Sequence, residues 1–275
     1  FEEWDRETLR QLVAYHQAKG TLIALADDEA NIQGVFMWYN CNSDDHWSFV
    51  EPTDADMLLI PDASTMRVVP WAREPTAQII HDCYHLEKKT PHPLSTRNVL
   101  RKVLDLYAAD GLRPVVAPEV EFFLVAKNID PDNELSPPVG RSGRAETSRH
   151  SYSMDAVSEF EDFVEDMYDY AEAQALDVDA LIHENGAAQM EINFLHGDAL
   201  SLADQVFAFK RTVRETAHKH GIYATFMAKP TQRECGSAMH IHQSLVRVED
   251  GTNIFADEAV KHTNEFLSYI AGLQE

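Results

Sequence analysis

The chain has 275 residues, 44% of them hydrophobic, and its 46 acidic and 23 basic residues give a net charge of −23 at pH 7. This hydrophobic content is enough to bury the core of a globular protein with one large domain or two smaller ones. The negative charge repels nucleic acid and anionic membranes at long range, so neither is expected as a partner.

Several features bear on the compartment. No apolar run approaches the ~18 residues that span a bilayer, and the first residues, Phe1 to Asp5, do not resemble a signal peptide. The three cysteines, at positions 41, 83 and 235, are far apart and fit neither a disulfide framework nor a CxxC metal site. We therefore expect a cytoplasmic protein with free thiols. Because the chain lacks an initiator Met and stops just after an apolar, helix-like run, we also expect the natural protein to be longer.

Residues 1–92 are predicted to form a small, strand-rich domain. An amphipathic helix is expected over residues 4–19, followed by strands over 21–26 and 34–39 and an apolar run over 57–60. The Pro91-His-Pro93 segment resembles a linker, which places the domain boundary near residue 92.

Residues 93–275 alternate strand and helix patterns. A helix capped by Ser95 or Thr96 is expected to end at Gly111, and Ser201 with Asp204 resembles a capping box for another helix that runs to Gly221. The other predicted elements are a strand over 115–125, a loop over 131–149, an acidic helix over 155–176, and strands over 223–228 and 239–245.

Three of the strand-like segments carry acidic or imidazole side chains at alternate positions. They are Glu119-Val-Glu121, Gln189-Met-Glu191-Ile-Asn193 and His240-Ile-His242-Gln-Ser244. Alternate strand residues share a face, so the polar members of each segment point the same way, while Val120, Met190, Ile192 and Ile241 are expected to face a core. With Glu184, the set offers four carboxylates and two imidazoles.

Such a cluster of carboxylates indicates a site for divalent cations. Like charges within a few ångströms resist joint ionisation unless a cation neutralises them, and oxygen-rich sites suit Mg²⁺ or Mn²⁺ better than Zn²⁺. Paired Mg²⁺ ions most often serve phosphoryl transfer. The sequence has neither a GxxxxGK[ST] loop nor a kinase-type GxGxxG, so a nucleotide would be held by the metals, His242 and the Ser244 hydroxyl. A single strand glutamate is more often a surface residue, but three matched segments weaken that interpretation.

Five ordered blocks resemble signature motifs of the glutamine synthetase superfamily. The three most specific are residues 117–124 (APEVEFFL), 183–193 (HENGAAQMEIN) and 236–245 (GSAMHIHQSL). Two further blocks are Pro61-Asp62 with Thr65 and Pro70-Trp71, and residues 224–230 (ATFMAKP). The resemblance covers nearly the whole chain, and the 137–144 loop (PPVGRSGR) and the His-Glu-Asn-Gly spacing are similar to the γ-glutamylpolyamine and γ-glutamylputrescine synthetase branch.

The resemblance implies an α+β protein in which a small N-terminal β-grasp domain precedes a catalytic α/β domain that is incomplete at its C-terminus. It also implies a dodecameric double ring with active sites between subunits. In this family ATP phosphorylates the γ-carboxylate of glutamate, and an amine then displaces phosphate to give a γ-glutamyl amide.

Site roles follow from the resemblance position by position. Glu121, Glu184 and Glu191 match the ligands of one metal, and Glu119 and His240 match ligands of another. His242 and Ser244 match positions on the ATP phosphates and nucleotide, and Asp179 is also expected near the nucleotide. Gly236, with Cys235 before it, matches the backbone that meets glutamate. No residue of the chain is assigned as a catalytic acid or base.

Two departures from the family pattern concern the substrates. Cys235 stands where glutamine synthetases carry an Asn that contacts glutamate, and residues 42–45 (NSDD) stand where an Asp-Gly-Ser-Ser loop helps to build the ammonium pocket. The second departure favours an organic amine over ammonia. The family's later motifs, including the substrate-binding arginines and the last metal glutamate, would fall beyond residue 275. An ammonia-using glutamine synthetase and a catalytically inert ring subunit are the alternative hypotheses.

Overall fold

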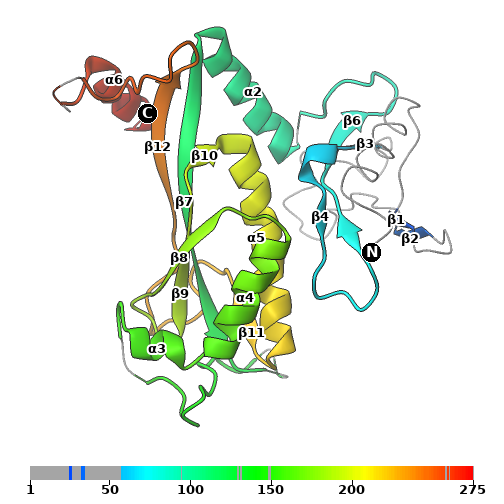
Figure 1. Ribbon diagram of the computed structural model, residues 1–275, viewed down its shortest axis with the longest axis vertical. Helices are drawn as coiled ribbons and strands as arrows, with labels where there is room; N and C mark the ends of the chain where they lie inside the picture. The colour runs from blue at the N-terminus through cyan, green and yellow to red at the C-terminus, as the bar shows by residue number, and fades with distance from the viewer. Residues whose placement is uncertain are drawn as a thin grey trace. The chain divides into compact units, whose positions relative to one another are not determined.

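The computed structural model describes residues 25–26, 32–34 and 57–274, except for residues 94, 129, 131, 148, 149, 258 and 260. The chain divides into two compact units (Figure 1). One comprises residues up to Arg67 together with Ala77–Val103, and the other comprises Val68–Thr76 together with Leu104–Glu275. In the described part of the chain, no helix is both long and apolar enough to cross a membrane.

The first unit contains short strand pairs, and the pairs β1–β2 and β3–β6 are antiparallel. Strands β1 (Leu25–Ala26) and β2 (Ile32–Gly34) form one pair, β3 (Met57–Pro61) and β6 (His81–His85) form a second, and β4 (Arg67–Val68) pairs with β5 (Ala77–Gln78). A short 3₁₀ helix, η2, covers Ala63–Thr65. The predicted helix over 4–19 lies outside the described residues, as does most of the strand predicted over 34–39. The β-grasp fold of this region therefore stays a prediction.

A six-stranded sheet organises the second unit. The long strand β7 (Leu112–Val125) pairs with β12 (Met239–Arg247), β10 (Gly197–Asp198), β9 (Gln189–Phe194) and β11 (Tyr223–Thr225), and β9 pairs in turn with β8 (Val178–His183). Each of these pairs is antiparallel. The three polar segments lie on β7, β9 and β12. Because β9 and β12 both pair directly with β7, this strand fixes the position of all three segments (Figure 1).

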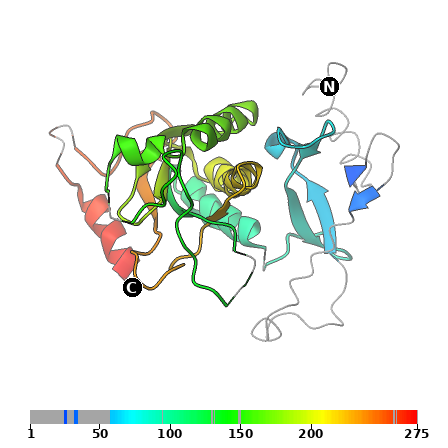
Figure 2. The ribbon, with the colours of Figure 1, turned by 90° about the horizontal axis from the view of Figure 1, so that it is seen from below.

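The helices are α2 (Thr96–Ala109), α3 (Met154–Ser158), α4 (Glu161–Ala173), α5 (Ala199–Lys219) and α6 (Asn264–Gln274). Helices α4 and α5 run alongside each other and share a buried core with the sheet (Figures 1 and 2). Helix α6 contacts β12, where the Tyr269 hydroxyl donates a hydrogen bond to the Gln243 side-chain oxygen.

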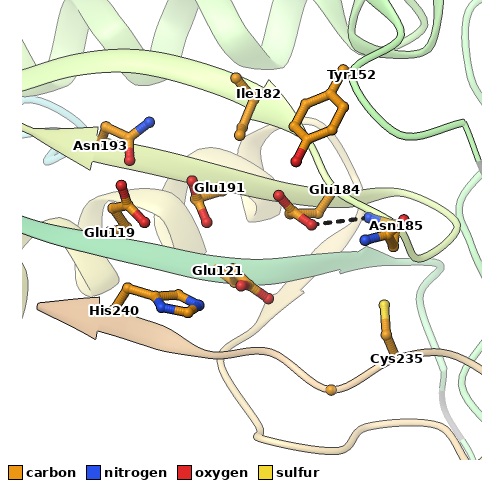
Figure 3. A pocket seen from close by; sticks show the side chains of 11 residues that line it. Glu119, Glu121, Tyr152, Ile182, Glu184, Asn185, Glu191, Asn193, Cys235 and His240 are labelled. Carbon is orange, nitrogen blue, oxygen red and sulfur yellow. Dashed lines mark hydrogen bonds between the residues drawn. The ribbon is translucent and has the colours of Figure 1, made fainter.

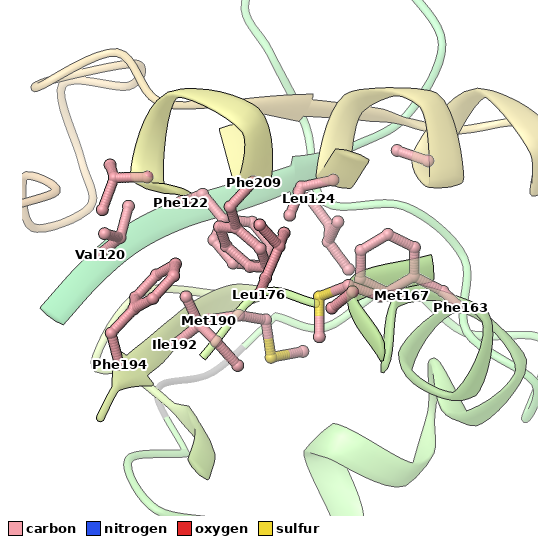
Figure 4. Close-up of a cluster of buried hydrophobic side chains, with 14 of the residues drawn as sticks. Val120, Phe122, Leu124, Phe163, Met167, Leu176, Met190, Ile192, Phe194 and Phe209 are labelled. Carbon is pink, nitrogen blue, oxygen red and sulfur yellow. The ribbon is translucent and has the colours of Figure 1, made fainter. Parts of the chain in front are cut away.

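The core lies between one face of the sheet and helices α4 and α5 (Figure 4). Strand β7 contributes Val120, Phe122 and Leu124, which are 0–3% exposed, and β9 contributes Met190 and Ile192, which are fully buried. The helices contribute buried side chains that include Phe163, Met167, Leu202, Phe209 and Val213. Since successive strand residues alternate between faces, the odd-numbered residues of this part of β7 point away from this core.

Three expectations about local structure are wrong. The helix predicted over 155–176 is two helices, α3 and α4, because Phe160 leaves the helical conformation with φ −121°. Helix α5 begins at Ala199 and is capped by Asp198, whose carboxylate accepts from the Ser201 N–H, so Ser201 is not the cap. Ile241 does not enter the core. It is 45% exposed, since its strand β12 pairs only with β7 in the described structure and so leaves one edge uncovered.

Candidate active site

The register of the sheet gathers the polar segments on the face opposite the core. Glu119 of β7 lies directly between His240 of β12 and Asn193 of β9, and Glu121 lies opposite Glu191 of β9. Directly paired strand residues carry their side chains on the same face. Strand pairing therefore brings together side chains that are as far as 121 positions apart in sequence, as between Glu119 and His240.

A cavity of about 530 Å³ opens at this position (Figure 3). All five predicted metal ligands line it: Glu119, Glu121, Glu184, Glu191 and His240. The two residues predicted to meet glutamate, Cys235 and Gly236, also line it. A methyl group on Gly236 would come within 2.7 Å of the Ala228 carbonyl oxygen, so glycine is required there for the backbone to approach this closely.

The predicted nucleotide residues do not line the cavity. His242 and Ser244 follow His240 at alternate positions of β12, on the same face of the strand, but they do not line the cavity. His242 Nε2 lies 2.8 Å from Glu119 Oε1. Asp179 is exposed near the start of β8, and it is not brought to the cavity.

The cavity lining is strongly acidic, and its charges oppose one another. Burial raises the pKa of Glu191 to about 7, and repulsion from Glu119, Glu184 and Glu121 acts in the same direction, while His240 opposes the shift. A carboxyl that resists ionisation because of its neighbours gains most from a cation placed among them. The electrostatics of the cavity therefore suit a divalent cation.

The chemistry of the donor set fits hard cations. Carboxylate oxygens with an imidazole and an amide oxygen are ligands that Mg²⁺ and Mn²⁺ accept, and the Asn193 side-chain oxygen is buried without a hydrogen-bond partner. In the described part of the chain, however, no three His, Cys, Asp or Glu side chains stand close enough together to hold one ion. The carboxylates have other partners: Glu119 contacts His242, and Glu121 accepts from Gln189. Metal binding would require these side chains to come closer together.

Gln189 links several parts of the site, although sequence reasoning assigned it no role. Its side chain is fully buried, and its Nε2 donates to Glu121 Oε2 at 2.8 Å and to the Gly236 carbonyl oxygen at 3.1 Å. Its Oε1 accepts from the Gly186 N–H at 2.9 Å and from the Cys235 thiol at 2.8 Å. All four hydrogen-bonding positions of this amide are used, so it ties β9 to β7 and to the 235–236 segment.

Sequence reasoning missed two of the lining residues and left two others without a role. Tyr152 and Ile182 line the cavity near Glu184 (Figure 3). Asn185 and Asn193 also line it, although they belong to predicted motifs. Tyr152 comes from the end of an irregular segment and has a positive φ of 60°. Strand alternation could not have found it, because its position depends on how that segment packs.

Comparisons with known proteins place the chain in one family. The family described as "Glutamine synthetase, catalytic domain" matches residues 93–275. A glutamate–isopropylamine ligase of Pseudomonas sp. is 38% identical over 203 residues, which are 74% of this chain and 43% of that protein. The gamma-glutamylputrescine synthetase PuuA of Escherichia coli (strain K12) is 36% identical over 190 residues, which are 68% of this chain and 40% of that protein.

A solved structure of a GmaS/ADP complex is similar in fold, with a TM-score of 0.70, 28% identity and coverage of 82% of this chain and 50% of that one. The chain belongs to the glutamine synthetase family. The expected likeness to the γ-glutamylpolyamine and γ-glutamylputrescine synthetase branch is confirmed. The chain spans less than half the length of these two curated relatives.

Proposed function

We propose that the protein is an ATP-dependent ligase that joins glutamate to an organic amine through a γ-glutamyl phosphate intermediate. The observation that carries the proposal is the set of four carboxylates and His240 around one cavity. The pairing of β12, β7 and β9 places all of them except Glu184, which lies on the loop between β8 and β9. Membership of the glutamine synthetase family supports the reaction class.

Magnesium or manganese ions would neutralise the charge that develops on the transferred phosphoryl group. Glu121, Glu184 and Glu191 are proposed to hold one ion, and Glu119 and His240 another. Gly236, which is exposed and lines the cavity, is proposed to meet glutamate with Cys235 beside it. His242, Ser244 and Asp179 are proposed to contact ATP. For His242 and Ser244 this is supported by their alternation with His240 along β12.

An organic amine is the proposed acceptor of the glutamyl group. The name of one relative includes isopropylamine, and the name of the other includes γ-glutamylputrescine. An acidic cavity also attracts an alkylammonium ion, and Ile182 gives its wall an apolar side chain near Glu184 (Figure 3). The matched residues cover 43% and 40% of these two relatives, so the complete activity is proposed and is not assigned to this chain alone.

We also propose the domain organisation and the assembly that the family resemblance implies. These are the N-terminal β-grasp domain, the boundary near residue 92, and assembly into rings of twelve subunits with shared active sites. The match of the catalytic family to residues 93–275 supports the placing of the catalytic domain.

The test is phosphate release by the purified protein with ATP, glutamate and Mg²⁺ or Mn²⁺, with ammonium, isopropylamine, putrescine and spermidine compared as acceptors. Release stimulated by an organic amine and not by ammonium, with the γ-glutamyl amide identified by mass spectrometry, is the expected result. Stimulation by ammonium alone would identify a glutamine synthetase instead. No release with any amine, from protein that binds Mn²⁺, would favour the inert ring subunit.

A further inference from the structure

The loop that joins β8 to β9 carries Glu184 and Asn185 into the cavity. It is closed at its base by the Glu184 N–H, which donates to the Gln189 carbonyl oxygen at 2.8 Å. Ala188, at its far end, has a left-handed backbone with φ 56°. A residue with a Cβ adopts this conformation only at a cost of about 1–3 kcal/mol, so surrounding contacts must hold it there.

Glu146, which is distant in sequence, supplies one of those contacts. Its Oε2 accepts from the Ala188 N–H at 2.6 Å and lies 3.0 Å from His183 Nε2. The other ring nitrogen of His183 lies 2.8 Å from the Glu184 carbonyl oxygen. A single carboxylate oxygen therefore holds the residue before Glu184 and the residue that ends the loop.

Two residues that follow Glu146 in the chain, Ser151 and Tyr152, also contact the end of β8 and the β8–β9 loop. The Tyr152 N–H donates to the His183 carbonyl oxygen at 2.8 Å, and the Ser151 hydroxyl donates to the Asn185 side-chain oxygen. The His183 side chain is 0% exposed and that of Glu146 is 11% exposed. Water therefore competes little for the contact between Glu146 and His183.

We propose that Glu146, through His183 and Ala188, is a positioning residue that sets the place of Glu184 in the cavity. Glu146 does not line the cavity. Its effect on the proposed metal site passes through the loop, in the way that partners of metal ligands orient them. This inference rests on the proposed function where it concerns metal affinity.

A buried carboxylate beside a histidine could instead act only through its charge or only on global stability. Two conservative variants separate these roles. Glu146→Asp keeps the charge but withdraws the carboxylate by one C–C bond, about 1.5 Å, so it cannot reach both His183 and Ala188. Glu146→Gln removes the charge but keeps the length of the side chain, so its amide oxygen can still accept from the Ala188 N–H.

A matched control is a carboxylate that binds the same segment from outside it, at the end of α3. The Glu159 carboxylate accepts from the Ser142 N–H at 3.0 Å, so it anchors the segment at a point outside the cavity lining. Glu159→Ala removes a carboxylate anchor of the same segment without touching the β8–β9 loop.

The experiment measures Mn²⁺ affinity by calorimetry without nucleotide, together with hydrogen exchange of the Ala188 amide and thermal unfolding. Glu146→Asp is expected to weaken Mn²⁺ binding by roughly 10-fold and to speed exchange at Ala188 by a similar factor. Glu146→Gln and Glu159→Ala are expected to stay within about threefold of the unmodified protein in both measurements.

Wild-type Mn²⁺ affinity and amide exchange in folded Glu146→Asp would overturn the proposal. An equal or larger loss of affinity in Glu146→Gln would also overturn it, because charge rather than reach would then be decisive. If the unmodified protein binds no Mn²⁺, the proposed function fails, and the exchange rates at Ala188 alone decide whether Glu146 holds the loop.

Discussion

The two faces of the β7–β9 pair differ in what holds them together. On one face Val120, Phe122 and Met190 are almost completely buried against α4 and α5. On the other face Glu121 and Glu191 lie opposite each other and repel. The two sets alternate along the same strands, so neighbouring residues of this pair belong in turn to the core and to the site.

This difference separates stability from function within a few residues. Burial of apolar surface stabilises the fold by roughly 25 cal/mol per Å², whereas carboxylates held together lower stability until a cation or proton neutralises them. The core face therefore holds the acidic face in place. Substitutions on the two faces should have opposite signatures.

The largest effect is expected from Phe122, which is fully buried between the sheet and the helices. Phe122→Ala should lower the free energy of unfolding by about 3–5 kcal/mol, because it leaves a cavity in the core. Urea denaturation of metal-free protein measures this loss. A loss below about 1 kcal/mol would show that the two faces are not divided as described.

The next effect is a pH dependence on the acidic face. The pKa of Glu191 is about 7 in the folded protein, against an ordinary value of 4.5. A carboxyl with a raised folded pKa binds its proton more tightly in the folded state, so its stabilising contribution is complete below pH 4.5 and is lost as pH rises to about 7.

Glu191→Gln removes this contribution, so the variant isolates it from other titrating groups. In metal-free buffer, the stability of the unmodified protein relative to the variant should fall by about 1–3 kcal/mol across this window and then stay level, because solvent in the open cavity screens part of the repulsion. Chemical denaturation at a series of pH values provides the measurement. A difference that does not change with pH would contradict the assigned repulsion.

Activity should respond in the opposite direction to stability. Glu191→Gln should reduce amine-dependent phosphate release by at least ~100-fold, equivalent to about 2.7 kcal/mol, while the metal-free protein above pH 7 becomes more stable. Glu165→Gln, on the exposed surface of α4, is the matched control and should change neither property. Retained activity in Glu191→Gln would remove this residue from the proposed metal site.

The last effect concerns the β8–β9 loop. A methyl group on Gly186 would lie 2.5 Å from the Phe123 ring and 2.8 Å from Gln189 Oε1. Gly186→Ala should therefore cost about 1–3 kcal/mol of stability and weaken Mn²⁺ binding through displacement of Gln189. Thermal unfolding and calorimetry test both parts. An unchanged melting temperature would mean that Phe123 moves aside freely.

Much of the site could be predicted from strand alternation, because this rule depends only on residues that are neighbours in the sequence. The two-residue period of a strand is enough to place Glu119 and Glu121 on one face, and Val120 on the other. The same rule fails for Ile241. Its alternation is correct, but burial also requires a covering layer, and β12 lies at an edge of the described sheet.

The sequence by itself determined the alternation of polar and apolar residues in β7, β9 and β12, the approximate extent of most elements, and the chemical type of the site. Only the tertiary structure decided that β7 stands between β12 and β9, with His240, Glu119 and Asn193 in one row. It also decided that Tyr152, Gln189 and Glu146 support or line the cavity. The physical reason is that strand register and loop anchoring depend on contacts between segments far apart in the chain, which no local periodicity encodes.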